Sequence, residues 1–280
     1  MFSIYSSAFN LVKNGFNYLD SLDNFTAFAD EVVISTISNN EDNTLEILKD
    51  YQKSNPKLKI KVCDLDRKDP IFWGKLRDAG LQECTQEFCI SLDLDELIPI
   101  WKKYDWMSYA RSLGFSEFDA YLVPLINLWG DVEHIRWDSE TNYLFKWVLH
   151  KNPKSTKPNL KRGPVNFALL PDGTVDIDKS DTNELIYTDG NLVKFSPIIS
   201  NKNGNAIDYI SECQEKIFVY HTGYLSFENR VLRNKNFWNE QFKIQAGNRQ
   251  DASANRFAPT EQQALWEKSL VKHGLKLWYE

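Results

Sequence analysis

The sequence predicts an α/β fold built on a mostly parallel sheet, and three observations lead to this prediction. First, apolar segments of strand type alternate with helical segments over the first hundred residues, at the spacing of βαβ units. Second, residues 88–92 form an apolar run of the kind that is buried on both faces of a parallel sheet. Third, Asp93 and Asp95 end this run at the expected carboxyl edge of the sheet, where α/β proteins bind their ligands.

The first hundred residues are expected to form a doubly wound, Rossmann-like half. Strands are expected at 2–6, 32–35, 58–63 and 88–93, and helices at about 10–22, 44–51 and 72–84. Asn43 or Asp42 would cap the second helix, because short polar side chains accept hydrogen bonds from the backbone N–H groups of a helix start. Pro99 marks the first turn of the next helix.

Beyond residue 100 the pattern mixes helices, strands and turns. Helices are expected at 101–113, 227–243 and 260–273, and strands at 120–126, 143–150 and 217–220. Pro124 predicts an edge strand or a bulge, because proline cannot donate a backbone hydrogen bond. Glycine-containing turns at 172–173 and 189–190 predict hairpins, and the basic segment 151–162 predicts a loop.

The composition bounds the class of protein. A chain of 280 residues can bury roughly three quarters of its unfolded surface, as one large domain or two small ones. Its four cysteines show no paired spacing, which favours a reducing compartment. The net charge of -6 argues against a nucleic-acid-binding protein. No stretch approaches the roughly 20 apolar residues of a transmembrane segment, so a cytoplasmic protein is expected.

The acids after residue 92 are the first candidates for chemistry. Two carboxylates at one strand end repel each other unless a cation or a hydrogen-bonding partner lies between them. A divalent metal is therefore one interpretation, and solvated strand-end acids are the other. The same Asp-x-Asp spacing occurs at 64–66 and 176–178, so the spacing alone is a weak signal. Only at Asp93 and Asp95 does the pair close an apolar strand and precede a helix start.

Four segments of the first hundred residues carry a resemblance to a known family. They are residues 29–34 (Ala-Asp-Glu-Val-Val-Ile), 42–47 (Asp-Asn-Thr-Leu-Glu-Ile), 77–81 (Arg-Asp-Ala-Gly-Leu) and 92–96 (Leu-Asp-Leu-Asp-Glu). In this order and spacing they resemble the nucleotide-sugar-binding half of family-2-like glycosyltransferases of the GT-A fold. Residues 220–224 (Tyr-His-Thr-Gly-Tyr) are similar to the segment that such enzymes place after their last strand.

The resemblance implies one continuous GT-A domain with a mostly parallel central sheet flanked by helices. Residues 1–100 would be the nucleotide-sugar-binding half and residues 101–280 the acceptor-side half. The resemblance also implies a metal site for Mn²⁺ or Mg²⁺, with Asp95 as direct ligand, Asp93 on the ribose or the metal, and His221 completing the site. An imidazole ligand favours Mn²⁺. The alternative for His221 is an ordinary histidine at a strand end.

The resemblance further implies contacts to the nucleotide from Ser6, Asn10 and Arg77. The alternatives are a helix-capping cluster for Ser6 and Asn10 and a surface charge for Arg77. The family usually has an aspartate just after its second strand to hold the base, whereas this chain has residues 35–37 (Ser-Thr-Ile) there. Asp64, at the end of the third strand, is a possible substitute. This departure leaves the choice between uracil and guanine open, with a UDP-sugar favoured as donor and a GDP-sugar possible.

The acceptor side offers weaker candidates. An inverting transfer needs a base for the acceptor hydroxyl, and Asp131 and Glu133 are the candidates, with solvated turn acids as the alternative. Three tryptophans are candidate sugar-stacking surfaces: Trp129, Trp137 and Trp147. Three basic residues are candidates for neutralising the diphosphate: Arg230, Arg233 and Lys235.

We therefore expect a metal-dependent, hexosyltransferase-type glycosyltransferase of inverting outcome, which moves a sugar to a glycan or another hydroxyl acceptor. One alternative is a non-catalytic module of the same fold that binds a nucleotide-sugar or glycan. Another is a sugar nucleotidyltransferase. That class usually carries a glycine-rich basic loop after its first strand, which residues 6–10 (Ser-Ser-Ala-Phe-Asn) do not provide.

Overall fold

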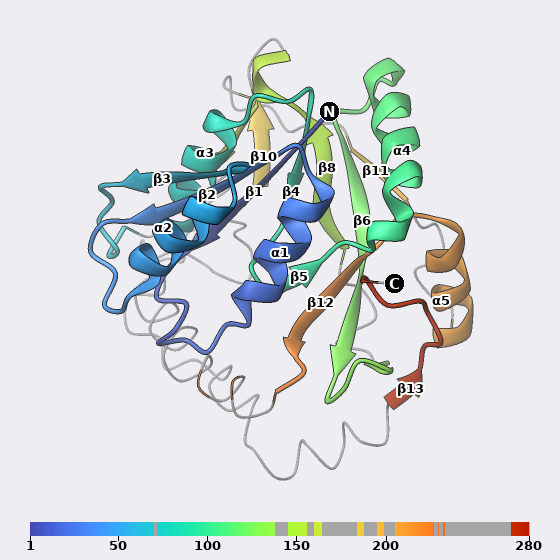
Figure 1. Cartoon of the computed structure of the whole chain (residues 1–280). Coiled ribbons are helices and arrows are strands. Elements are labelled where there is room, and N and C mark those ends of the chain that lie inside the picture. Colours follow the sequence, from blue (N-terminus) through green and yellow to red (C-terminus); the bar gives the residue numbers. More distant parts are fainter. Residues whose placement is uncertain are drawn as a thin grey trace, which may run out of the picture.

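One large mixed sheet with helices on both faces organises the molecule (Figure 1). The structure is a computed structural model that describes residues 1–69, 72–137, 145–155, 160–163, 184–187, 195–198, 205–226, 229, 232 and 270–279. Within these residues eleven strands form the sheet, in the order β13-β7-β6-β8-β4-β1-β2-β3 with β5, β11 and β12 paired beside this path. The predicted α/β class is confirmed.

The first half of the sheet is parallel. It consists of β1 (Phe2–Ala8), β2 (Glu31–Ile37), β3 (Leu58–Cys63) and β4 (Phe88–Ser91), with β1 between β4 and β2. The strands β2 and β4 are buried along their whole length, as their apolar sequences predict, whereas β3 at the sheet edge has exposed positions. The chain winds outward from β1 in both directions, and in sheets of this kind ligands bind outside the carboxyl ends of the strands where the winding reverses.

Helices cover both faces of this parallel half. The helices α1 (Tyr18–Phe28) and α2 (Thr44–Ser54) lie in front of it in Figure 1, and α3 (Phe72–Glu83) packs on β1 and β2 from the other face. The alternation of side chains in β1 explains this arrangement, because Ile4 packs in one core with Phe25, whereas Tyr5 packs in another with Leu81. The predicted Rossmann-like half is confirmed.

The predicted start of the first helix was wrong. Residues 10–15 form turns, and α1 begins only at Tyr18. Asn10 has a positive φ of 46°, which takes the chain out of the helical conformation. The apolar spacing misled here because Leu11 is buried from the loop, whereas Leu19 of the helix is exposed. At the start of α2, Asp42 Oδ1 accepts a hydrogen bond from the Thr44 N–H (3.0 Å).

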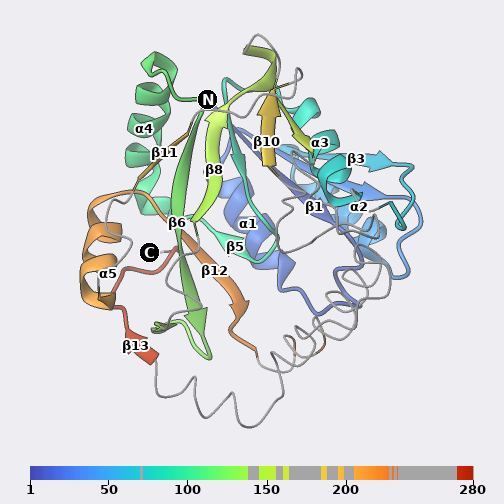
Figure 2. The same ribbon diagram turned by 180° about the vertical axis from the view of Figure 1, so that it is seen from behind.

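The second half adds antiparallel strands to the sheet. Its first elements are β5 (Glu96–Leu97), the 3-10 helix η1 (Ile100–Lys102), α4 (Lys103–Phe115), β6 (Ala120–Trp129), β7 (His134–Arg136) and β8 (Phe145–Lys151). Seen from behind, β8 lies between β6 and β4 and is antiparallel to both (Figure 2). The helix expected after Pro99 is present, although the short strand β5 precedes it.

The edge position predicted from Pro124 was wrong, and the bulge in this pair of strands does not lie at Pro124. The strand β6 lies inside the sheet, and its pairing with β8 shifts register between Tyr121 and Leu122. On its other side, β6 pairs with β11 (Phe195–Pro197) up to Leu122 and with β12 (Val219–Tyr224) from Leu125 onward. Pro124 therefore lies at the junction of two partner strands, where its missing N–H breaks neither ladder.

The remaining described elements are η2 (Pro153–Ser155), β9 (Leu160–Gly163), β10 (Glu184–Tyr187), α5 (Ala206–Glu215) and β13 (Leu270–Lys272). The end of the predicted helix 260–273 was wrong, because β13 pairs with β7 as an antiparallel strand. Most of that helix and most of the expected helix 227–243 lie outside the described residues, as do the hairpins expected at 172–173 and 189–190. Among the described helices, none has the length and apolar character needed to cross a bilayer.

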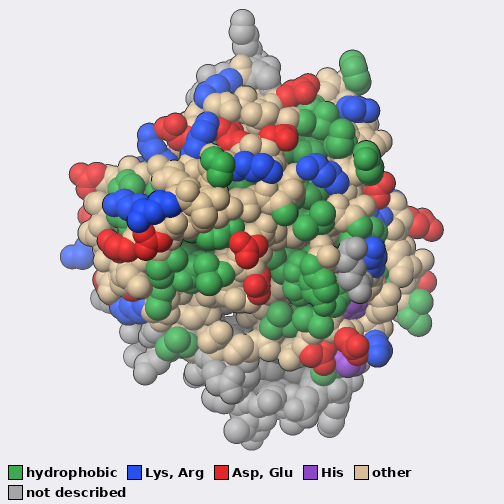
Figure 3. Space-filling model, in the orientation of Figure 1, with side chains coloured by type: hydrophobic (Ala, Val, Ile, Leu, Met, Phe, Trp, Pro, Cys, Tyr) green, Lys and Arg blue, Asp and Glu red, His purple; other side chains and the backbone are tan. Residues whose placement is uncertain are grey.

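Charged side chains of both signs are interspersed on the face shown in Figure 3. Neither sign of charge dominates this face.

The buried side chain of His273 is expected to make the free energy of unfolding depend on pH. His273 is 5% exposed, its Nε2–H donates to the Val132 carbonyl (2.8 Å), and its Nδ1 accepts from the Leu275 N–H (2.9 Å). Burial lowers the pKa of this imidazole from 6.5. Because the unfolded chain binds the proton more tightly, the stabilisation is complete above about pH 6.5 and is lost as the pH falls through the folded-state pKa. In thermal unfolding between about pH 7 and 5, His273→Gln should show a smaller loss of stability than the wild type, and equal losses would contradict this account.

Candidate functional site

The carboxyl ends of β4, β6 and β12 bring together residues that are far apart in the sequence. The strand β12 is parallel to β6 and antiparallel to β5, which begins directly after Asp95. In this register His221 lies opposite Asn127 of β6 on one side and opposite Glu96 of β5 on the other. The pairing of these strands therefore brings His221 close to Asp95.

Asp95 and His221 are in direct contact. Asp95 Oδ2 lies 3.3 Å from His221 Nε2, across 126 positions of the chain. Asp95 is 5% exposed, and its backbone carbonyl accepts hydrogen bonds from the N–H (2.7 Å) and the hydroxyl (2.9 Å) of Thr222. The hydrogen bonds between Thr222 and the backbone of Asp95 thus hold the carboxylate beside the imidazole. Two of the three residues expected in a metal site, Asp95 and His221, are therefore in contact.

Asp93 makes a different contact. Its Oδ1 accepts a hydrogen bond from the guanidinium of Arg77, and its backbone N–H donates to Glu96 Oε2 (2.7 Å). Among the described residues, no three side chains of His, Cys, Asp or Glu form a group that could hold a metal ion. The donor set that the structure does offer, one carboxylate and one imidazole, suits an ion whose other positions are filled by phosphate oxygens and water.

Arg77 lies beside Asp93 with its charge preserved. Burial alone would lower the pKa of the guanidinium, but the nearby carboxylates of Asp93 and Glu96 outweigh it, and the pKa is raised. The Nε atom of Arg77 is buried and has no hydrogen-bond partner, and the same holds for the hydroxyls of Ser6 and Ser91. Buried donors are normally paired. A polar ligand at the carboxyl ends of β1 and β4 would supply partners for such groups.

Asn10 and Asp64, which the sequence also suggests as nucleotide contacts, lie in the loop after β1 and directly after β3. Asn10 is 1% exposed and joins two loops, because its Oδ1 accepts from the Glu41 N–H (2.7 Å) and its N–H donates to Asn40 Oδ1 (2.9 Å). Asp64 is exposed at the end of β3. Ser35, which stands where the family has an aspartate, donates its hydroxyl to the Ser6 carbonyl (3.1 Å). Asn10 therefore has a structural task in this loop.

Replacement of Asn10 should separate its two roles in stability. Asn10→Ala is expected to lower the free energy of unfolding by about 2 kcal/mol, from a lost buried hydrogen bond and the cost of a positive φ. Asn10→Gly should lose only about 1 kcal/mol, because glycine adopts this φ freely. Urea unfolding of the three proteins measures both differences. Equal losses for the two variants would show that the backbone conformation is not the cause.

The candidate bases belong to the turn between β6 and β7. Asp131 Oδ1 accepts from the backbone N–H groups of Glu133 (2.8 Å) and His134 (2.9 Å). Burial would raise the pKa of Asp131, but these bonds and the His134 imidazole outweigh it, and the pKa is lowered. Glu133 Oε2 pairs with Lys272 Nζ (2.9 Å), which lowers the pKa of Glu133. A base of lowered pKa takes up an acceptor proton less readily at neutral pH.

The tryptophans proposed as sugar platforms are engaged with protein side chains. Trp129 is 8% exposed and stacks on Tyr224 with ring centroids 4.7 Å apart, while the Arg136 guanidinium lies 4.9 Å from its ring. Trp137 packs against Tyr209 at 5.0 Å. The side chain of Trp147 and three further candidates lie outside the described residues: Arg230, Arg233 and Lys235.

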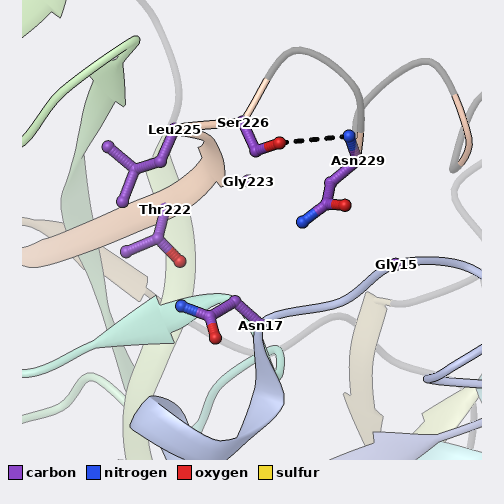
Figure 4. Close-up of a pocket in the computed structure, with 7 residues that line it drawn as sticks. All are labelled: Gly15, Asn17, Thr222, Gly223, Leu225, Ser226 and Asn229. Carbon is purple, nitrogen blue, oxygen red and sulfur yellow. Dashed lines mark hydrogen bonds between the residues drawn. The ribbon is translucent and has the colours of Figure 1, made fainter.

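A pocket next to the acid and imidazole was not foreseen from the sequence. Figure 4 shows it where the loop that precedes α1, with Asn17, approaches the end of β12, with Thr222. Its lining residues are Gly15, Asn17, Thr222, Gly223, Leu225, Ser226 and Asn229. Thr222 joins the pocket to the backbone of Asp95. Asn127 and Thr222 were missed because their positions depend on the register of β12, which no local pattern encodes.

Comparisons with known proteins give only general likenesses. No protein-family model and no curated protein matches the chain. Residues 1–349 of S. aureus TarS in complex with UDP-GlcNAc are similar over 96% of this chain and 79% of that chain, at 13% identity and a TM-score of 0.42. The mannosyltransferase PcManGT from Pyrobaculum calidifontis, in complex with GDP-Man and Mn²⁺, is similar over 44% of this chain and 34% of that chain, at 18% identity and a TM-score of 0.34.

A third similar structure is 4-diphosphocytidyl-2C-methyl-D-erythritol synthase from Anaerococcus prevotii. It covers 54% of this chain and 71% of its own length, at 12% identity and a TM-score of 0.31. All three TM-scores lie below 0.5, so any functional proposal has to stand on the residues of this chain.

Proposed function

We propose that this protein transfers a sugar from a nucleotide-sugar donor to a hydroxyl acceptor and that it uses a divalent cation, Mn²⁺ or Mg²⁺, to do so. The observation that carries the proposal is the contact of Asp95 with His221 at the carboxyl edge of the parallel strands. This contact joins two segments that carry the GT-A resemblance, residues 92–96 and residues 220–224, which are far apart in the sequence. Asp95 Oδ2 and His221 Nε2 would hold the cation.

The residues around this pair suit a diphosphate. When bound, a divalent cation supplies Lewis-acid stabilisation of the charge on the leaving nucleotide. Arg77, which pairs with Asp93, would contribute a permanent positive charge and an unpaired buried N–H. Asp93 pairs with Arg77, and by the family resemblance it would contact a ribose hydroxyl or the cation. Because Ser35 stands where the family has an aspartate, the choice between uracil and guanine is open, with UDP-sugars as the favoured donors and GDP-sugars as a second class.

An inverting transfer also needs a base for the acceptor hydroxyl. Asp131 and Glu133 are the acids offered by the chain for an inverting transfer, and both have lowered pKa values. If either acts as the base, Asp131→Asn or Glu133→Gln should lower transfer to an acceptor while the cation-dependent binding of the donor remains. The same observation favours a second candidate function, a module that binds a nucleotide-sugar without turnover.

A thermal-shift screen of UDP- and GDP-sugars, with and without Mn²⁺, tests donor binding first. A protein that binds the donor through the cation should gain stability only when both are present. Slow hydrolysis of the stabilising donor would then identify an enzyme, whereas stabilisation without hydrolysis would identify a binding module. Absence of stabilisation by every donor with Mn²⁺ would overturn the proposed function.

A further inference from the structure

Asn127 contacts the side of His221 that faces away from Asp95. It is 4% exposed, it lies opposite His221 in the pairing of β6 with β12, and its Oδ1 is 2.8 Å from His221 Nδ1. An amide oxygen can only accept a hydrogen bond, so the hydrogen of this contact belongs to Nδ1 of the imidazole. In the neutral ring, the other nitrogen then carries a lone pair.

This lone pair is directed toward a carboxylate. His221 Nε2 lies 3.3 Å from Asp95 Oδ2, and neither atom brings a hydrogen to the contact when Nδ1 holds it. Two acceptors at this distance repel each other unless a positive charge lies between them. The arrangement of Asn127, His221 and Asp95 therefore offers two adjacent electron-pair donors, one on β12 and the other in the turn directly before β5.

We infer that Asn127 is a positioning residue, which keeps His221 in the Nδ1–H tautomer so that Nε2 and Asp95 Oδ2 face a divalent cation together. The cation belongs to the proposed function, on which this part of the inference rests. The tautomer itself does not depend on any ligand. A hydrogen bond from the second ring nitrogen to a side-chain oxygen is the usual means of orienting a metal-binding histidine.

A tautomer measurement on the metal-free protein tests the role of Asn127. The chain has four histidines, so long-range ¹⁵N–¹H spectra of ¹⁵N-histidine-labelled protein can be assigned with the help of a His221→Gln variant. At a pH where all four imidazoles are neutral, the wild type should show the hydrogen of His221 on Nδ1. Asn127→Leu removes the acceptor, and the hydrogen should move to Nε2, where it can donate to Asp95.

Two further variants make the result specific. Asn127→Asp keeps an acceptor oxygen at the same place and should keep the hydrogen on Nδ1. Asn24→Leu removes another buried asparagine, which exchanges hydrogen bonds of 2.8 Å with the backbone of Ile98, and should lower stability without any change at His221. The inference is overturned if wild type and Asn127→Leu have the same tautomer, or if the wild type carries the hydrogen on Nε2.

Titration calorimetry with Mn²⁺ in the presence of UDP tests the cation part separately. Asn127→Leu should bind Mn²⁺ about 10- to 100-fold more weakly than the wild type, whereas Asn24→Leu should retain wild-type affinity. Equal affinity in wild type and Asn127→Leu would contradict a positioning role toward the cation. Failure of the wild type itself to bind Mn²⁺ would overturn the proposed function. The tautomer measurement would still decide whether Asn127 keeps the hydrogen of His221 on Nδ1.

Discussion

Asp95→Asn is expected to lower cation-dependent donor hydrolysis about a thousandfold. A Lewis-acid cation contributes several kcal/mol to the stability of the transition state, and about 1.4 kcal/mol corresponds to a factor of ten in rate. Asparagine has the size of aspartate, but its amide is a much poorer ligand for a divalent ion than a carboxylate. The bonds from Thr222 go to the backbone carbonyl of residue 95 and should persist in the variant.

The control for this variant is Asp50→Asn, which neutralises an exposed aspartate on α2 that pairs with Lys53. Donor hydrolysis is measured with excess Mn²⁺ for wild type and both variants, and unfolding temperatures without cation test whether the fold is retained. Asp50→Asn should hydrolyse the donor at the wild-type rate. Wild-type hydrolysis by Asp95→Asn would show that residue 95 holds no cation needed for the reaction.

Arg77→Met is expected to weaken the binding of UDP about 10- to 100-fold. The side chain of methionine fills a similar volume but removes the charge, and hydrogen bonds from a charged group are worth about 1.5–3 kcal/mol each. The variant also deprives Asp93 of its partner. Because the Asp93 side chain is 36% exposed, water can replace that partner, and the cost in unfolding free energy should be about 1–2 kcal/mol.

A double variant separates the two roles of Arg77. Arg77→Met with Asp93→Asn removes the unpaired charge and should recover most of the lost stability without recovering the affinity for UDP. Arg77→Lys keeps the charge but loses the planar fork, so its affinity should fall between those of wild type and Arg77→Met. Calorimetry with UDP and urea unfolding measure the two quantities. If Arg77→Met bound UDP as tightly as wild type, Arg77 would serve only to hold Asp93.

Local patterns predicted the parallel half of the sheet well. The strands around Ile4, Val33 and Ile90 are buried on both faces. Such strands need mainly apolar residues along their whole length, and these apolar runs can be recognised in the sequence. The first helix was misplaced because a turn at Asn10 depends on hydrogen bonds to the loop near Glu41, about 30 positions away. The end of the last predicted helix was wrong because β13 (Leu270–Lys272) pairs with the distant strand β7.

The sequence by itself determined the α/β class and the position of Asp93 and Asp95 at the end of a buried strand, because burial restricts composition residue by residue. Only the tertiary structure decided which acid meets His221 and which meets Arg77. It also placed Asn127 behind the imidazole. These contacts follow from the register between strands that are distant in the chain, and register is set by the packing of the whole sheet rather than by the residues next to each site.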